Sequence, residues 1–133
     1  MEAAEIRKIL ENCRAIAVVG CSSNPEKPAN KIPKYMKEHG YKIIPVNPNS
    51  ENILNEKTYK SISEIKENID IVDIFRPSEE CLNVVREAIK IKPKVVWMQL
   101  GIINEEAKRL AEKNGVKVIM DKCIMVEHKS LLN

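Results

Sequence analysis

Five short and almost wholly apolar runs recur along the chain, and a segment with helical features stands between each run and the next. The runs are Ala15–Val19, Lys42–Val46, Ile69–Phe75, Val95–Met98 and Val116–Met120. Runs of this length are too short for helices, and their composition is typical of strands that are buried on both faces. Strands of this kind in alternation with helices predict an α/β fold, with a parallel sheet between two layers of helices.

Capping residues mark where several helices are expected to start. Asn30 is expected to cap a helix that runs to Glu38, with Pro33 in its first turn, where a missing N–H costs little. Ser78 and Asn104 each precede two acidic residues, which suit the positive end of a helix dipole. The remaining expected helices are Ala3–Asn12 and a short one at Ser61–Lys66.

The alternation limits how the strands can be ordered. Right-handed crossovers favour a five-stranded parallel sheet of order 3-2-1-4-5 in a single Rossmann-like three-layer domain over residues 1–133. Pro45, inside the second strand, indicates limited pairing there. Ligands of open α/β sheets bind beyond the carboxyl ends of the strands, and this order puts the switch point between the first and fourth strands.

Composition excludes several classes of protein. The 133 residues are 44% hydrophobic and 31% charged, as in soluble globular proteins. The longest apolar run, Ala15–Val19, is far shorter than a membrane span, and no signal peptide is visible, so we expect a cytoplasmic protein without membrane contact. A net charge of +3 with few aromatic residues does not favour nucleic-acid binding. Four dispersed cysteines and two histidines give little support to a metal site.

The residues that follow the strands are unusually polar and small. They are Gly20, Cys21, Ser22 and Ser23 after the first strand, Asn47 and Pro48 after the second, Phe75 and Arg76 at the end of the third, and Gln99 and Gly101 after the fourth. A glycine, hydroxyls and backbone N–H groups close to a helix start suit a phosphate. Three lysines follow the loop after the first strand: Lys27, Lys31 and Lys34. Each lysine alone is explained by a solvated helix face, but the three together with Arg76 predict phosphate binding.

A nicotinamide dinucleotide is the alternative ligand for such a fold. Its fingerprint requires three spaced glycines after the first strand and an acid at the end of the second. Here the loop after the first strand has only Gly20, and Asn47 stands where the acid belongs. The sequence therefore favours a different phosphate-containing ligand.

Four motifs stand at or near the strand ends: V-N-P at Val46–Pro48, F-R at Phe75–Arg76, W-M-Q-L-G at Trp97–Gly101 and M-D-K-C at Met120–Cys123. Together they resemble the family of small stand-alone CoA-binding proteins. That family shares its fold with the N-terminal CoA-binding domain of succinyl-CoA synthetase α subunits. The likeness runs from about Ala15 to His128, and Pro33 is a local departure from the pattern.

The resemblance implies a binding site for coenzyme A at the strand ends. By this likeness the pyrophosphate would bind at Gly20, Cys21, Ser22 and Ser23, and the nucleotide phosphates would lie near Lys27 and Lys31. The adenosine would be lined by Val46, Asn47 and Pro48, and the nucleotide would be flanked by Phe75, Arg76 and Pro77. The pantetheine arm would lie toward Met98, Gln99 and Gly101.

No catalytic set can be assembled from the sequence. His39 and His128 are more simply explained as structural residues, and a Ser-His-Asp arrangement is not evident. The predicted function is therefore binding of CoA or an acyl-CoA as a carrier, sensor or regulatory module without catalysis of its own. The alternative is an enzyme, either a nicotinamide-dependent oxidoreductase or a ligase subunit that needs a partner chain.

Two further hypotheses concern single segments. Cys21, beside helix N–H groups that lower a thiol pKa, could form a mixed disulfide with CoA, although a small buried filler is the simpler interpretation. The apolar segment Ile124–Val126 could pack against another subunit, which would make the protein a homo-oligomer or part of a complex.

Overall fold

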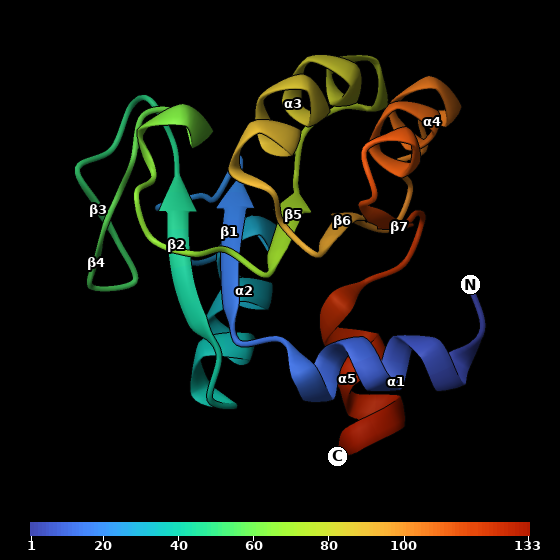
Figure 1. Cartoon of the computed structure of the whole chain (residues 1–133). Helices are drawn as coiled ribbons and strands as arrows, with labels where there is room; N and C mark the ends of the chain where they lie inside the picture. Colours follow the sequence, from blue (N-terminus) through green and yellow to red (C-terminus); the bar gives the residue numbers. More distant parts are fainter.

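Five parallel strands form the central sheet of the computed structural model, which describes residues 1–133 (Figure 1). The strands are β1 (Ala15–Val19), β2 (Lys42–Val46), β5 (Ile71–Ile74), β6 (Val95–Met98) and β7 (Lys117–Ile119). All residues of β1, β5 and β6 are buried, as the apolar runs predicted. The structure confirms an α/β domain of Rossmann type.

The order of the strands differs from the prediction. The sheet runs β2-β1-β5-β6-β7, which is 2-1-3-4-5 when its strands are counted along the chain, so the expected order 3-2-1-4-5 is wrong. The second strand is an edge strand, where Pro45 does least harm because it has no N–H to donate. The third strand pairs with the other side of β1, and the switch point therefore lies between β1 and β5.

The connection from β2 to β5 contains small elements that the sequence did not predict. A two-stranded hairpin of β3 (Asn52–Ile53) and β4 (Glu56–Lys57) lies beyond the outer side of β2 (Figure 1). The expected helix at Ser61–Lys66 is reduced to one 3-10 turn, η1 (Ile62–Glu64). The chain then crosses over the sheet to reach β5.

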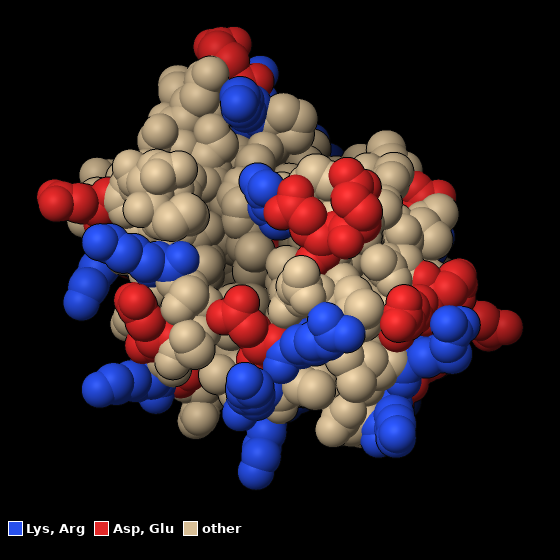
Figure 2. All heavy atoms as spheres, turned by 90° about the horizontal axis from the view of Figure 1, so that it is seen from above, with Lys and Arg blue, Asp and Glu red and all other residues tan.

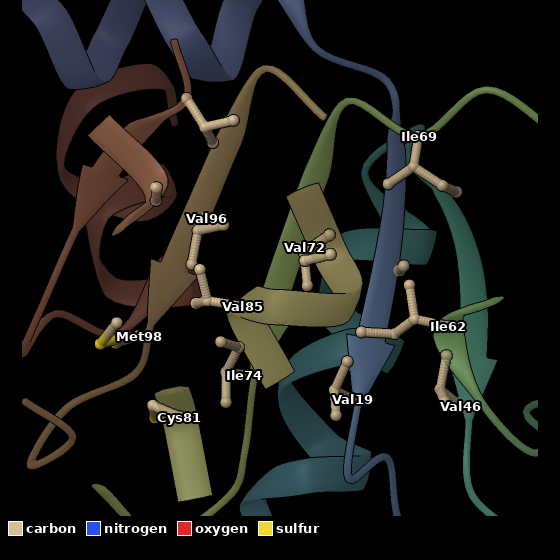
Figure 3. Packing of buried hydrophobic residues seen from close by; sticks show 14 of the residues in the cluster. Val19, Val46, Ile62, Ile69, Val72, Ile74, Cys81, Val85, Val96 and Met98 are labelled. Atoms are coloured by element: carbon tan, nitrogen blue, oxygen red, sulfur yellow. The ribbon is translucent and has the colours of Figure 1, made fainter. Parts of the chain in front are cut away.

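Helices cover both faces of the sheet and enclose two apolar clusters. On one face, α3 (Cys81–Ala88) and α4 (Glu105–Lys113) close a cluster of 19 buried residues. On the other, α1 (Ala3–Asn12), α2 (Pro28–Glu38) and α5 (Ile124–Leu132) close a cluster of 17. Figure 3 shows Cys81 and Val85 of α3 against Ile74 and Val96 of the sheet. Alternate strand residues therefore supply the two cores.

The start of α2 corrects one expectation and links this helix to the loop after β1. The helix begins at Pro28, so Asn30 is not its cap; Asn30 is buried and donates from Nδ2 to the Ser22 carbonyl at 2.8 Å. Pro33 consequently lies inside the helix rather than in its first turn. Since Pro33 has no N–H, the Ala29 carbonyl has no helical donor and accepts the Ser22 N–H at 3.1 Å instead.

Of the two other expected helix starts, the one at Asn104 is confirmed and the one at Ser78 is not. Asn104 caps α4 as predicted, because its side chain accepts the Ala107 N–H at 2.9 Å. Ser78 does not cap a helix; its Oγ accepts the Ile103 N–H at 3.0 Å, and the segment opens with the 3-10 turn η2 (Ser78–Glu80) before α3. A further 3-10 turn, η3 (Ile89–Ile91), extends α3.

The C-terminal helix α5 was not predicted. Ile124, proposed above as part of a subunit contact, is fully buried in the chain's own core, so that part of the hypothesis is wrong. Val126 remains 52% exposed. None of the helices combines the length and the apolar character that crossing a bilayer requires.

Candidate functional site

Two adjoining hollows lie at the carboxyl ends of the strands. The first, here called the polar cleft, has a volume of about 640 Å³, and the second, the apolar groove, has about 550 Å³. They share Lys27, Ala29, Phe75 and Arg76. Figure 2 looks onto this edge of the molecule, where uncharged surface is hollowed between basic and acidic side chains. The two hollows flank the switch point between β1 and β5, where the observed strand order places a ligand.

The polar cleft is built around the loop after β1 and the start of α2. The Ser22 N–H is held by Ala29, but the backbone N–H groups of Cys21, Ser23 and Ala29 donate no hydrogen bond within the chain. Ala29 is in the first turn of an 11-residue helix, whose N–H groups and dipole favour an anion. Cys21 and Ala29 line the cleft, and their two unused donors therefore suit a phosphate group.

Gly20 lines the polar cleft and also joins two strand ends. It has a φ of +83°, and a Cβ at this position would lie 2.5 Å from the Phe75 carbonyl oxygen and 2.9 Å from Cδ of Arg76. Its N–H donates to Val46 at 3.1 Å. Glycine is required here because the loop after β1 packs directly on the backbone after β5.

Asn47 also has a positioning role in the cleft. Its Nδ2 donates to the Cys21 carbonyl at 2.8 Å, and its Oδ1 accepts the Asn49 N–H at 2.7 Å. Both ends of the amide are therefore used within the chain. The side chain fixes the loop after β2 against the loop after β1.

Arg76 is the best-oriented cation of the cleft. Its Nε and Nη2 donate to the Glu80 carboxylate at 2.8–3.1 Å, and its Nη1 has no partner. The pair is half-exposed, so its value for stability is small, but it fixes the plane of the guanidinium. Nη1 remains available to a phosphate. Glu80 and Glu87 also line the cleft, which is therefore not uniformly positive.

The structure brings most of the predicted site residues together. The following residues line the polar cleft: Gly20, Cys21, Ser22, Lys27, Val46, Asn47, Pro48, Phe75 and Arg76. Pro77 and Gln99 line the apolar groove. Ser23, Lys31, Met98 and Gly101 line neither hollow. Met98 is fully buried in the core, whereas the other three are exposed.

Several lining residues were not anticipated from the sequence. In the cleft these include Ala29, Lys60, Ser61 and Val84, and in the groove they include Ile32, Leu100, Ile102 and Cys123. Leu100 and Cys123 stand inside the motifs W-M-Q-L-G and M-D-K-C, so the motifs carried a signal for them. Lys60 is brought in because the Tyr59 N–H bonds to Pro45, a contact with no local signal.

Cys21 is not a reactive thiol in this structure. It is fully buried, and burial, with an added effect of the nearby Asp73, raises its pKa to about 12. A thiolate at neutral pH is therefore strongly disfavoured, which contradicts the hypothesis of a lowered pKa. Asp73 itself is buried within β5, and burial raises its pKa well above the usual value for a carboxyl group.

The two histidines pack together away from the hollows. His128 of α5 shares a hydrogen bond of 2.8 Å between its Nδ1 and the Tyr35 hydroxyl, and the rings of His39 and His128 lie 5.2 Å apart. Burial, and then His39, lower the pKa of His128. Neither ring lines the polar cleft or the apolar groove, and this cluster instead holds α5 against the end of α2.

Comparisons with known proteins identify relatives over nearly the whole chain. The uncharacterised protein YneT of Bacillus subtilis is 43% identical over 94% of this chain and 93% of its own length. A solved structure, described as a hypothetical protein from Pyrococcus horikoshii, has a TM-score of 0.97 and 40% identity, and the match covers 100% of this chain and 94% of that one.

Larger enzymes contain a similar region. The α subunit of an ADP-forming acetate–CoA ligase II from Pyrococcus furiosus is 32% identical over 90% of this chain, but this chain matches only 29% of that subunit. The named enzymes among these relatives are acetate–CoA ligases, so the expected likeness to succinyl-CoA synthetase is supported only loosely, through them. The family described as CoA binding domain matches residues 14–129, and the chain therefore belongs to this family of Rossmann-like CoA-binding domains.

Proposed function

We propose that this protein binds coenzyme A, with the nucleotide and its phosphates in the polar cleft and the pantetheine arm directed toward the apolar groove. The observation that carries the proposal is the pair of unused N–H groups of Cys21, after β1, and Ala29, in the first turn of α2, which line the same cleft as the oriented guanidinium of Arg76. Membership of the CoA binding domain family supports this choice of ligand.

The cleft offers different partners to different parts of the ligand. The pyrophosphate would accept from the free N–H groups after β1 and at Ala29, while Lys27 and Nη1 of Arg76 neutralise phosphate charge. Val46 and Pro48 line the same cleft and offer apolar contacts to the adenosine. The fixed acceptor Glu80 keeps Arg76 in place before the ligand arrives, which lowers the entropy lost on binding.

The proposed role is that of a CoA carrier, sensor or regulatory module. The residues of the polar cleft are binding groups, and both histidines lie elsewhere. A second candidate is a ligase subunit that acts with a partner chain, which the relationship to acetate–CoA ligase α subunits favours. In both cases CoA occupies the same cleft.

Calorimetric titration tests the proposal directly. Protein stripped of ligand by unfolding and refolding is titrated with CoA, NAD and NADP, in the wild type and in Arg76→Ala. We expect the wild type to bind CoA and neither nicotinamide dinucleotide. The CoA affinity of Arg76→Ala should be lower by about tenfold or more, because a hydrogen bond to a charged group contributes about 1.5–3 kcal/mol.

Arg86→Ala is the matched control. Arg86 is an exposed arginine of α3 whose Nη1 bonds Asn83, and it lines neither hollow. Its removal should leave CoA affinity within twofold of the wild type. Nicotinamide binding without CoA binding would refute the proposal and favour the oxidoreductase alternative.

A further inference from the structure

The apolar groove has a character that the pantetheine arm alone does not explain. It lies next to the polar cleft and shares Phe75 and Arg76 with it, so one ligand can extend from one hollow into the other. Beyond this shared rim the lining is aliphatic, with Ile32 from α2 and Leu100 and Ile102 from the loop after β6. The chemistry of the site therefore changes from phosphate-binding to hydrocarbon-binding along its length.

Two polar groups of Gln99 at the groove are already in use. Gln99 is buried, and its Oε1 accepts the Ile124 N–H at 3.0 Å. The Gln99 N–H lies 3.4 Å from the Ile74 carbonyl, to which it donates. The pantetheine arm carries two amide groups that need partners when water is removed. A hydrocarbon chain needs none and matches the aliphatic part of the lining, which Ile32, Leu100 and Ile102 form.

The groove also leaves apolar surface in water. Leu100 is 70% exposed although it lines the groove, and Ile103 of the same loop is 47% exposed. Large exposed aliphatic side chains beside a hollow are typical of a surface that a ligand covers. Continuity with the proposed CoA cleft selects the occupant: the acyl chain of a thioester whose CoA part fills that cleft.

We infer that the protein prefers medium-chain acyl-CoA over free CoA and acetyl-CoA, and that the apolar groove holds the acyl chain. This inference rests on the proposed function, because the CoA part anchors the ligand in the polar cleft. Leu100 and Ile102 are the residues that distinguish chain lengths, since both lie in the groove and outside the cleft.

The expected preference follows from the burial of methylene groups. A fully buried methylene strengthens binding by about fourfold, and a groove that is open on one side gives about half of that free energy, or about twofold. Octanoyl-CoA has six more methylenes than acetyl-CoA and should bind about 60-fold more tightly. Burial of the chain should also make the heat capacity change of binding more negative for octanoyl-CoA.

Titration of the full chain with CoA, acetyl-CoA and octanoyl-CoA at several temperatures tests the inference. Leu100→Ser should reduce the ratio between octanoyl-CoA and acetyl-CoA affinity by fivefold or more. Val126→Ser is the matched control, because Val126 is a similarly exposed aliphatic residue on α5 outside the groove, and it should leave the ratio unchanged.

Each contrary result has a distinct meaning. If octanoyl-CoA binds within threefold of acetyl-CoA while CoA itself binds, the inference fails and the proposed function stands. If no CoA compound binds, the proposed function fails as well. A preference that persists unchanged in Leu100→Ser overturns the assignment of the chain to this groove. A dimer that dissociates in Leu100→Ser, without any acyl preference, assigns the groove to a second copy of the chain instead.

Discussion

Replacement of Gly20 by alanine tests how closely the loop after β1 packs on β5. An added Cβ would lie 2.5 Å from the Phe75 carbonyl oxygen, well inside van der Waals contact, and 2.9 Å from Cδ of Arg76. The left-handed backbone of Gly20, with φ of +83°, costs alanine about 1–2 kcal/mol by itself. Separation of the two backbones adds about 1–3 kcal/mol, as overpacking does elsewhere.

Gly115→Ala separates these two contributions. Gly115 has a nearly equal φ of +77°, but a Cβ there would meet no atom within 4 Å. We expect a loss of about 1 kcal/mol in the free energy of unfolding for Gly115→Ala and about 3 kcal/mol for Gly20→Ala. The difference of about 2 kcal/mol measures the contact with Phe75.

Urea unfolding followed by tryptophan fluorescence is a suitable assay. Trp97 is the only tryptophan, it is fully buried in β6, and its Nε1 donates to the Lys122 carbonyl, so its emission reports loss of the core. Because the clash also displaces Arg76, CoA affinity should fall in Gly20→Ala and not in Gly115→Ala. Equal losses of stability in the two variants would show that backbone strain alone matters and that the close packing is not real.

Two further substitutions test other features of the site. The pKa of Asp73 is raised on folding by burial, so its contribution to stability is complete below the pKa of the unfolded chain and declines as the pH rises through the pKa of the folded state. Asp73→Asn cannot ionise and should flatten the pH dependence of unfolding in urea above the usual pKa of a carboxyl group; parallel curves for the variant and the wild type would contradict a raised pKa. Pro33→Ala supplies an N–H that competes with Ser22 for the Ala29 carbonyl, so we expect a more stable helix, by about 1 kcal/mol, and CoA affinity reduced severalfold. Unchanged affinity in titration would mean that this contact does not hold the loop.

Local patterns predicted the elements that depend on local chemistry. The five strands were found because both of their faces are covered, which leaves no exposed positions in β1, β5 or β6. Asn104 was identified correctly as a cap because its partner, Ala107, lies three residues away. The residues directly after the strands were placed near one another because parallel strands end at one edge.

Features that depend on distant contacts were missed. Ser78 has the composition of a cap but accepts from Ile103, 25 residues further on. The strand order depends on the path after β2, and only Pro45 indicated that this strand lies at an edge. Cys21 follows a strand and precedes a helix, which suggested a reactive thiol, but its actual burial depends on packing that a local pattern does not contain.

The segment beside β2 also bears on how the protein avoids self-association through its sheet. An uncovered edge strand is a template on which another chain can add a strand. Here Tyr59 donates its N–H to the Pro45 carbonyl at 3.0 Å and accepts the Asn47 N–H at 2.9 Å, so this part of the outer edge is occupied. The opposite edge, β7, has only three residues and carries the exposed Lys117. Growth of an intermolecular sheet from β2 therefore requires the Tyr59 segment to detach first, which also removes Lys60 from the polar cleft.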